Sequence, residues 1–462
     1  MQVPAHVFRE YDIRGIADRE LSSDLALAIG RGFGAALIEA GTGGRRLKIA
    51  VGRDCRLSSP RLFEALTGGL LQAGVDVIDI GVGPTPMLYF AVHHLEADGG
   101  VMITGSHNPG DENGFKLMKG KASFYADDIR RLRDRLIAGL PASQASAGSM
   151  QSADVSRAYV ERMCEGIDLS ASGLSVVIDA GNGSAGPIGL AALRRAGVEP
   201  VALYCEMDGR FPNHHPDPTV VANLSSLIRK MKETKATVGL AWDGDGDRLG
   251  AVDASGEVVW GDKLMVLFAR DLLTRRPGAA ILGEVKCSQT LYDDIERHGG
   301  RAILWKTGHS NIKTKMKEEG ALLAGEMSGH LFFADRYFGY DDGIYAALRL
   351  LEILGRAKRT MGELLSDVPR TFVTPELRVD CPDDIKFDVV RRVLARYRER
   401  YRVIDVDGAR ILFGDGAWGL VRASNTGPVL VLRFEATSEA RRDELRAEVE
   451  AAVAEERKAL AG

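Results

Sequence analysis

The sequence has few cysteines, and none of them forms a closely spaced pair. The five are scattered along the chain: Cys55, Cys164, Cys205, Cys287 and Cys381. None of them forms a Cys-x-x-Cys pair, which argues against a cysteine zinc site, a redox motif and a disulfide scaffold. With no apolar signal region in residues 1–15, we expect reduced thiols in a cytoplasmic protein.

The chain also lacks a long apolar run and a strong excess of charge. None of its 462 residues belongs to a run of membrane-spanning length, and the formal net charge of −4 with a pI near 6.2 argues against a general nucleic-acid binder. No Walker A motif occurs, and Gly244-Asp245-Gly246 lacks the glycine spacing of a dinucleotide fingerprint. A local basic pocket for a small anion remains compatible with these numbers.

Apolar strands alternate with amphipathic helices through most of the chain. In the first part, strands are predicted over 47–51, 75–80 and 101–103, and helices over 60–73, 86–95 and 127–136. The pattern restarts near residue 174 and near residue 261, and it changes after Pro369. We expect three similar α/β domains with mainly parallel mixed sheets and a smaller C-terminal α+β domain. The predicted ranges are 1–150, 151–256, 257–368 and 369–462.

Ser106 stands in a turn that directly follows an apolar strand. Thr104-Gly105-Ser106-His107-Asn108-Pro109 comes after Gly100-Val101-Met102-Ile103 and places a hydroxyl, backbone N–H groups and an imidazole on one loop. Alone, Ser106 could be an ordinary turn serine. Three more loops of comparable character downstream favour a catalytic nucleophile.

Three aspartates alternate with glycines after the strand that ends at Trp242. Asp243, Asp245 and Asp247 can converge their oxygens on one point, and like charges this close need a cation. All-oxygen ligands select Mg²⁺ or Ca²⁺, and an EF-hand is excluded because Arg248 and Ala254 stand where that loop needs Gly and Glu. An aspartyl nucleophile, as in phosphatases, remains the alternative for this loop.

Two further loops offer groups that suit a sugar phosphate. Gly325-Glu326-Met327-Ser328-Gly329-His330 places a carboxylate and a hydroxyl where they can read paired sugar hydroxyls, although a simple helix-entry turn fits equally well. Arg422-Ala423-Ser424-Asn425-Thr426-Gly427-Pro428 is predicted to be a turn between strands that can cradle a phosphate, although taken alone a plain polar hairpin turn is the commoner case. Lys286 and His309 lie at other strand ends. Together these loops predict phosphoryl transfer on a phosphorylated polyol.

The order and spacing of the four loops resemble the α-D-phosphohexomutase superfamily, and most closely its bacterial phosphomannomutase/phosphoglucomutase branch. The motifs are TGSHNP, DGDGDR, GEMSGH and RASNTGP, supported by residues 8–15 and 113–116. The likeness covers essentially the whole chain. It implies domains arranged around a central cleft, and a phosphoserine enzyme.

The resemblance also implies roles for individual residues. Ser106 would be phosphorylated, and Asp243, Asp245, Asp247 and the Ser106 phosphoryl oxygen would hold one Mg²⁺ per chain. Glu326 and Ser328 would read sugar hydroxyls, and Arg422, Ser424, Asn425 and Thr426 would hold the phosphate that is not transferred. Further cleft positions are Tyr11, Arg14, His107, Lys116, Arg248, Lys286, His309 and His330. His107 and Lys116 are the candidates for general acid and base. Arg248 is also expected to be a catalytic residue.

The reaction implied is reversible transfer of phosphate between C1 and C6 of glucose or mannose phosphates, through phosphoserine and a hexose 1,6-bisphosphate that is both intermediate and activator. A phosphoglucosamine mutase-like specificity and a metal-dependent sugar phosphatase are the alternatives. The expected partners are small hexose phosphates, with neither nucleic acid nor membrane. A monomer is expected, with a dimer as the alternative.

Overall fold

The computed structural model describes residues 3–41, 44–140, 146–424 and 427–461. The chain divides into two compact units, of which the first comprises Met1–Gly261 and Ser328–Glu363 and the second Asp262–Met327 and Leu364–Gly462. The serine and acidic loops belong to the first unit, whereas Glu326 and Arg422 belong to the second. The chain crosses from the second unit back to the first between Met327 and Ser328.

The N-terminal part of the first unit is built on a mixed sheet. Its strands follow the order β1-β5-β4-β2-β3-β7, with β6 paired to β5. The inner strands β4, β2 and β3 are parallel, as is β7 against β3, whereas β5 runs antiparallel to β4 and β1. The elements are η1 (Ala5–Val7), β1 (Ile13–Ile16), α1 (Ser23–Glu39), β2 (Lys48–Arg53), α2 (Ser59–Gln72), β3 (Asp76–Val82), α3 (Thr85–His94), β4 (Gly99–Ile103), β5 (Glu112–Lys119), β6 (Ala122–Phe124), α4 (Asp127–Ala138) and β7 (Met150–Ser152).

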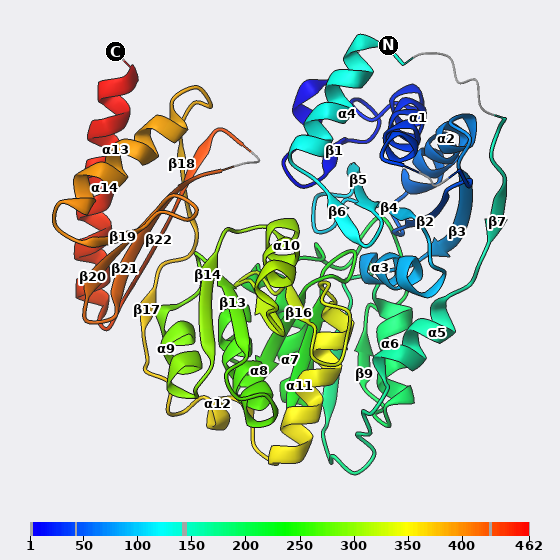
Figure 1. Cartoon of the computed structure of the whole chain (residues 1–462). Helices are drawn as coiled ribbons and strands as arrows, with labels where there is room; N and C mark the ends of the chain where they lie inside the picture. The colour runs from blue at the N-terminus through cyan, green and yellow to red at the C-terminus, as the bar shows by residue number, and fades with distance from the viewer. Residues whose placement is uncertain (1–2, 42–43, 141–145, 425–426, 462) are drawn as a thin grey trace. The chain divides into compact units, whose positions relative to one another are not determined.

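Helices α1, α2 and α4 share one apolar core with this sheet (Figure 1). Helix α3 also contacts β2 and β4, but it lies outside that core. Two glycines let α1 and α2 approach until their backbones touch. A Cβ on Gly30 would lie 2.1 Å from the carbonyl oxygen of Leu66, and one on Gly69 would lie 2.1 Å from that of Leu27. Larger residues at either position would separate the helices and open the core that supports β4.

The rest of the first unit surrounds a second mixed sheet of order β12-β11-β10-β8-β9. Strand β10 is parallel to β8 and antiparallel to β11, so the acidic loop sits in the turn between β10 and β11. Trp242, at the end of β10, donates its indole N–H to the carbonyl of Gly343 at 3.0 Å, which ties α11 to this strand. The elements are α5 (Ser156–Met163), β8 (Val176–Asp179), α6 (Gly186–Arg195), β9 (Val201–Leu203), η2 (Val221–Leu224), α7 (Ser225–Thr234), β10 (Val238–Trp242), β11 (Leu249–Asp253), β12 (Val258–Val259), β16 (Leu331–Phe333), α11 (Gly343–Ala357) and α12 (Met361–Leu364).

The second unit combines parallel strands with an antiparallel C-terminal sheet. Strand β13 pairs in parallel with β14 and β15. The C-terminal strands follow the order β17-β22-β21-β20-β19, with β18 on β22, and α13 and α14 pack together on the core of this sheet. The elements are α8 (Gly261–Arg275), β13 (Ala280–Glu284), α9 (Gln289–Arg297), β14 (Arg301–Trp305), α10 (His309–Glu319), β15 (Leu323–Gly325), β17 (Phe372–Val373), β18 (Leu377–Asp380), α13 (Lys386–Arg398), β19 (Arg402–Ile404), β20 (Ala409–Gly414), β21 (Ala417–Ala423), β22 (Val429–Ala436) and α14 (Glu439–Ala461).

The predicted fold class is confirmed, with three α/β sheets and an antiparallel sheet packed against two helices at the C-terminus. One local prediction was wrong: Arg422 is not in a turn but in β21, where it pairs with Val431 of β22. Strand β5, which carries Lys116, was not predicted at all. The domain boundaries stay predictions. Among the described residues, no helix is both long and apolar enough to span a bilayer.

Candidate active site

Ser106 lies just beyond β4 and faces the acidic loop within the first unit. Its hydroxyl donates to Oδ2 of Asp243 at 3.0 Å and lies 3.3 Å from Nδ1 of His107. The backbone of Ser106 has a φ of +51°, in the left-handed region that a non-glycine residue rarely adopts. Strain of this kind is found at sites where the surroundings hold a reactive group in one orientation. Ser106 is buried, with 2% of its surface exposed.

The three predicted metal ligands converge as expected. Asp243, Asp245 and Asp247 are fully buried, and their ligand oxygens lie within 4.8 Å of one another. Burial and the two neighbouring carboxylates raise the pKa of Asp243 well above its ordinary value. Oδ1 of Asp245 and Oδ1 of Asp247 are buried without a hydrogen-bond partner among the described residues. Buried carboxylates that converge, two of them with an oxygen that accepts no hydrogen bond from the described residues, fit a hard divalent cation.

Lys116 supplies a positive charge to this acidic cluster. From the centre of β5, its ammonium donates to Oδ2 of Asp245 at 2.7 Å and to Oδ2 of Asp247 at 2.5 Å. Burial alone would lower the pKa of Lys116, but attraction to Asp245 and Asp247 outweighs it and raises that pKa. Burial, together with the charges of Arg248 and Arg14, lowers the pKa of His107. Near Ser106, Lys116 is therefore a cation, whereas the imidazole of His107 is neutral.

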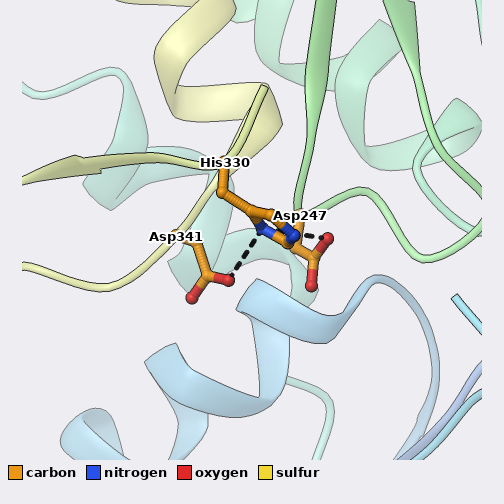
Figure 2. Close-up of side chains that lie close together, drawn as sticks. All are labelled: Asp247, His330 and Asp341. Atoms are coloured by element: carbon orange, nitrogen blue, oxygen red, sulfur yellow. Dashed lines mark ion pairs between the residues drawn. The ribbon is translucent and has the colours of Figure 1, made fainter. Parts of the chain in front are cut away.

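His330 lies between two carboxylates, Asp247 and Asp341 (Figure 2). Its Nδ1 lies 3.1 Å from Oδ2 of Asp341 and 3.5 Å from Oδ1 of Asp247. Backbone groups of Arg248 and His330 form an isolated antiparallel bridge, which makes their side chains neighbours. Asp247, His330 and Asp341 could also form a metal-binding group. However, Arg248 donates to Nε2 of His330, so a neutral ring carries its proton on Nδ1 and would have to lose that proton to bind a metal there.

Arg14 also lies at the serine loop. Its guanidinium donates to the side-chain oxygen of Asn108 at 2.7 Å and to Asp12 at 2.6 Å. Tyr11, in the same N-terminal segment, is half-buried. The first unit therefore brings a hydroxyl, three clustered carboxylates and several cationic groups to one place.

Three strand-end loops of the second unit meet at Glu284, the last residue of β13. Its carboxylate accepts from the hydroxyl of Thr307 at 2.7 Å and from the backbone N–H of Lys286 at 3.1 Å. Burial raises the pKa of Glu284, and the nearby Glu326 adds to the effect. Oε1 of Glu326 accepts from the backbone N–H of Gly308 at 2.7 Å. These hydrogen bonds therefore place Lys286 and Glu326 next to the residues that precede His309.

Arg422 is oriented by Asp407, a residue of the turn between β19 and β20. Nε of Arg422 donates to Oδ2 of Asp407 at 3.1 Å, and the same oxygen accepts from the backbone N–H of Thr307 at 3.1 Å. Arg422 and Ser424 are both largely buried. Asn425 and Thr426 lie outside the described residues, so the predicted phosphate cradle is seen only in part. Ser328 and His330 belong to the first unit, whereas Glu326 belongs to the second.

Known proteins resemble this chain over nearly its whole length. Profiles described as phosphoglucomutase/phosphomannomutase alpha/beta/alpha domains I, II and III match residues 5–137, 157–256 and 260–372, and the profile of the C-terminal domain matches residues 376–452. This chain belongs to the phosphoglucomutase/phosphomannomutase family. The resemblance read from the four loops is thereby confirmed, and the chain is an enzyme of the mutase class.

Individual relatives support the same family. The chain is 46% identical over 441 residues to a phosphomannomutase/phosphoglucomutase of Pseudomonas putida, covering 95% of this chain and 93% of that protein. It is 45% identical over 442 residues to a phosphoglucomutase of Neisseria gonorrhoeae, covering 94% of each. A crystal structure of a phosphoglucomutase/phosphomannomutase family protein from Burkholderia thailandensis matches with a TM-score of 0.91 at 42% identity, covering 98% of both chains.

Within this family site, several supporting residues were missed by the sequence analysis. Thr85 donates to Oδ2 of Asp245 at 2.6 Å. Three other missed residues also contact predicted site residues or their loops, as described above: Asp341, Glu284 and Asp407. Asp54 and Arg56, at the end of β2, contact the serine loop. These last two could have been found, because they follow an apolar strand just as Ser106 and Asp243 do.

Proposed function

We propose that this protein catalyses reversible transfer of a phosphoryl group between C1 and C6 of mannose and glucose phosphates. The observation that carries the proposal is the hydrogen bond of 3.0 Å from the hydroxyl of Ser106 to Asp243, inside a group of three buried carboxylates. A nucleophile beside a metal-binding group suits phosphoryl transfer, which depends mainly on positioning and charge neutralisation. Asp243, Asp245, Asp247 and a phosphoryl oxygen on Ser106 would hold one Mg²⁺, which would neutralise charge on the transferred group.

The proposed reaction uses Ser106 twice. In the first transfer, the bond from phosphorus to the Ser106 oxygen breaks, a bond from phosphorus to the sugar hydroxyl oxygen forms, and the hydroxyl proton ends on Ser106. The resulting hexose 1,6-bisphosphate turns round and returns its other phosphate to Ser106. His107 and Lys116 are the candidates to move the proton, and Arg248 would stabilise charge on the transferred phosphate.

The binding groups are assigned by their chemistry. Glu326 and Ser328 would read sugar hydroxyls, because a carboxylate and a hydroxyl can hydrogen-bond a pair of neighbouring hydroxyls. Arg422, Ser424, Asn425 and Thr426 would hold the phosphate that is not transferred, since a guanidinium offers two parallel donors to phosphate oxygens. The remaining groups proposed to line the site are Tyr11, Arg14, Lys286, His309 and His330.

The role of Ser106 is tested with Ser106→Ala, and Ser170→Ala at an exposed position is the control. The intact mass of the wild type should increase by one phosphoryl group after treatment with glucose 1,6-bisphosphate, and Ser106→Ala should show no increase and lose most activity. A fully active Ser106→Ala would overturn the mechanism. The rival is a phosphatase that uses Asp243 as nucleophile. Its acyl phosphate would be cleaved by hydroxylamine, whereas phosphoserine would survive.

We propose that both glucose and mannose phosphates are substrates. The two sugars differ only at C2, while Glu326 and Ser328 suit hydroxyls that both sugars share. Glu326→Gln should therefore lower kcat/KM for both sugars alike, and a loss confined to one sugar would contradict this assignment. Glucosamine phosphate, measured alongside, tests the alternative specificity.

We also propose a monomer, with a dimer as the alternative. A cytoplasmic enzyme is consistent with five free thiols. The proposed domain boundaries remain near residues 150, 256 and 368, and limited proteolysis followed by mass measurement would test them.

A further inference from the structure

The guanidinium of Arg56 lies buried beneath the Ser106 loop. Its side chain is 0% exposed. Nη2 donates to the backbone carbonyls of Ser106 and Asn108, each at 2.7 Å. Nη1 donates to the carbonyl of Glu112 at 3.0 Å and also to that of Pro109. One side chain therefore binds four carbonyl groups that converge from a single loop.

Asp54 completes this arrangement from the same strand end. Its Oδ2 accepts from Nε of Arg56 at 3.1 Å and from the backbone N–H of Gly105 at 3.2 Å. Its Oδ1 accepts from the hydroxyl of Ser59 at 2.7 Å, which anchors the carboxylate to the start of α2. The loop is thus held through its carbonyls by Arg56 and through an N–H by Asp54.

The arrangement bears directly on the orientation of Ser106. The left-handed backbone of Ser106 is unfavourable for a residue with a side chain and persists only where its surroundings hold it. Arg56 binds the Ser106 carbonyl, while the Ser106 hydroxyl reaches Asp243. Gly105 fits closely over the guanidinium, since a Cβ there would lie 2.5 Å from Cζ of Arg56.

We propose that Arg56 is a positioning residue that holds Ser106 in the orientation required for in-line phosphoryl transfer. This inference rests on the proposed role of Ser106 as the phosphorylated residue. Four converging carbonyls present their negative ends to one point, so they need a cation with several donors in a plane. Arginine meets that need. Lysine keeps the charge but offers three donors from a single nitrogen, and it cannot serve four carbonyls and a carboxylate together.

The inference is tested with Arg56→Lys, and Arg61→Lys is the matched control. Arg61 lies in α2 and donates to the carbonyls of Ala17 and Leu21 rather than to the four carbonyls that Arg56 binds. The measurements are kcat, the Kd for glucose 1-phosphate, the melting temperature, and the single-turnover rate at which dephosphorylated enzyme is phosphorylated by glucose 1,6-bisphosphate.

In Arg56→Lys, kcat and the phosphorylation rate should fall about 100-fold per folded molecule, as a misplacement of about 1 Å produces, while Kd changes less than about threefold. Both variants should melt at a lower temperature, but Arg61→Lys should keep wild-type rates. A purely structural role for Arg56 would lower the melting temperature without lowering the rate per folded molecule.

Asp54→Asn keeps Arg56 and removes the charge that orients it, so it replaces Arg56→Lys if the latter does not fold. It should lower the phosphorylation rate by a smaller factor, about tenfold. A folded variant of either kind with wild-type rates would overturn the inference. Failure of the proposed function gives a different result. If glucose 1,6-bisphosphate did not phosphorylate Ser106 of the wild type, the role of Ser106 itself would be refuted before any Arg56 variant is measured.

Discussion

Nε of Arg248 lies 2.9 Å from Nε2 of His330 and donates a hydrogen bond to it. A guanidinium has only donors, so this contact makes Nε2 the acceptor and leaves the ring proton on Nδ1. Nδ1 in turn faces Asp341 and Asp247 (Figure 2). Arg248 therefore selects one tautomer of His330, and as the last residue of the acidic loop it also donates its backbone N–H to Asp243 at 3.1 Å.

We predict that Arg248→Lys retains the fold and loses activity. Lysine keeps the positive charge but has no N–H at the position of Nε, so His330 loses its defined tautomer. The loss of a hydrogen bond from a charged group, worth about 1.5–3 kcal/mol, corresponds to a fall in kcat of roughly 10- to 100-fold. Steady-state kinetics provide the measurement. Arg157→Lys, at an exposed site, should be fully active, and equal activity of the two variants would refute the assignment.

We predict that Mg²⁺ stabilises the protein through the three aspartates. After removal of divalent ions with EDTA, the buried carboxylates repel one another, so added Mg²⁺ should raise the melting temperature. The rise should reach roughly 5 °C at 100 times the Kd. Asp245→Asn should abolish this dependence, whereas Asp168→Asn, at an exposed turn, should preserve it. An unchanged response in Asp245→Asn would place the metal elsewhere.

We predict a graded loss of substrate binding at Arg422. Asp407 fixes the orientation of its guanidinium, which is what a two-pronged grip on phosphate requires. Arg422→Ala should lower kcat/KM by roughly 10- to 100-fold and release more bisphosphate during turnover, and Arg422→Lys should be less impaired. Arg402→Ala, at an exposed position of β19, is the control. If Arg422→Ala left kcat/KM and bisphosphate release at wild-type values, Arg422 would not hold the phosphate.

We predict that His214 makes stability depend on pH. Burial alone would lower the pKa of His214, but its contact with Asp179 at 3.0 Å outweighs burial and raises that pKa. A raised pKa in the folded state means that the stabilisation is complete below the unfolded value, about 6.5, and is lost as pH rises through the folded value. The contribution should be at most about 1 kcal/mol.

Thermal unfolding near pH 5.5 and pH 8.5 checks this prediction. Substitution His214→Gln should lower the melting temperature more at the lower pH than at the higher one. Substitution His94→Gln, at an exposed position, should have the same small effect at both. The prediction fails if the two pH values give His214→Gln the same difference from the wild type.

Much of the site could be predicted from the sequence because each loop has a local signature. Ser106, Asp243 and Glu326 all stand just after an apolar strand, in turns with glycine on one or both sides. Such a pattern depends on neighbouring residues alone, and it is visible without the fold. Arg422 was misplaced for a related reason, since the turn residues after it obscured the fact that its own side chain belongs to β21.

The contacts that support these groups could not be predicted in the same way. The family resemblance named Lys116 as a site residue, but not that it pairs from β5 with Asp245 and Asp247, more than a hundred residues later in the chain. Asp341 approaches His330 from the segment before α11, and Asp407 reaches both Arg422 and Thr307. None of these contacts has a sequence spacing of its own, because each results from the packing of separate sheets and loops.

The sequence by itself determined most of the strands, the loops that follow them and the chemical groups that those loops carry, because strand periodicity and turn chemistry are local properties. Only the tertiary structure decided that the hydroxyl of Ser106 reaches Asp243, and that Arg56 holds the carbonyls of the Ser106 loop. Both contacts join residues 50 or more positions apart. Distances of that kind are set by how buried strands pack, and no local pattern of residues encodes them.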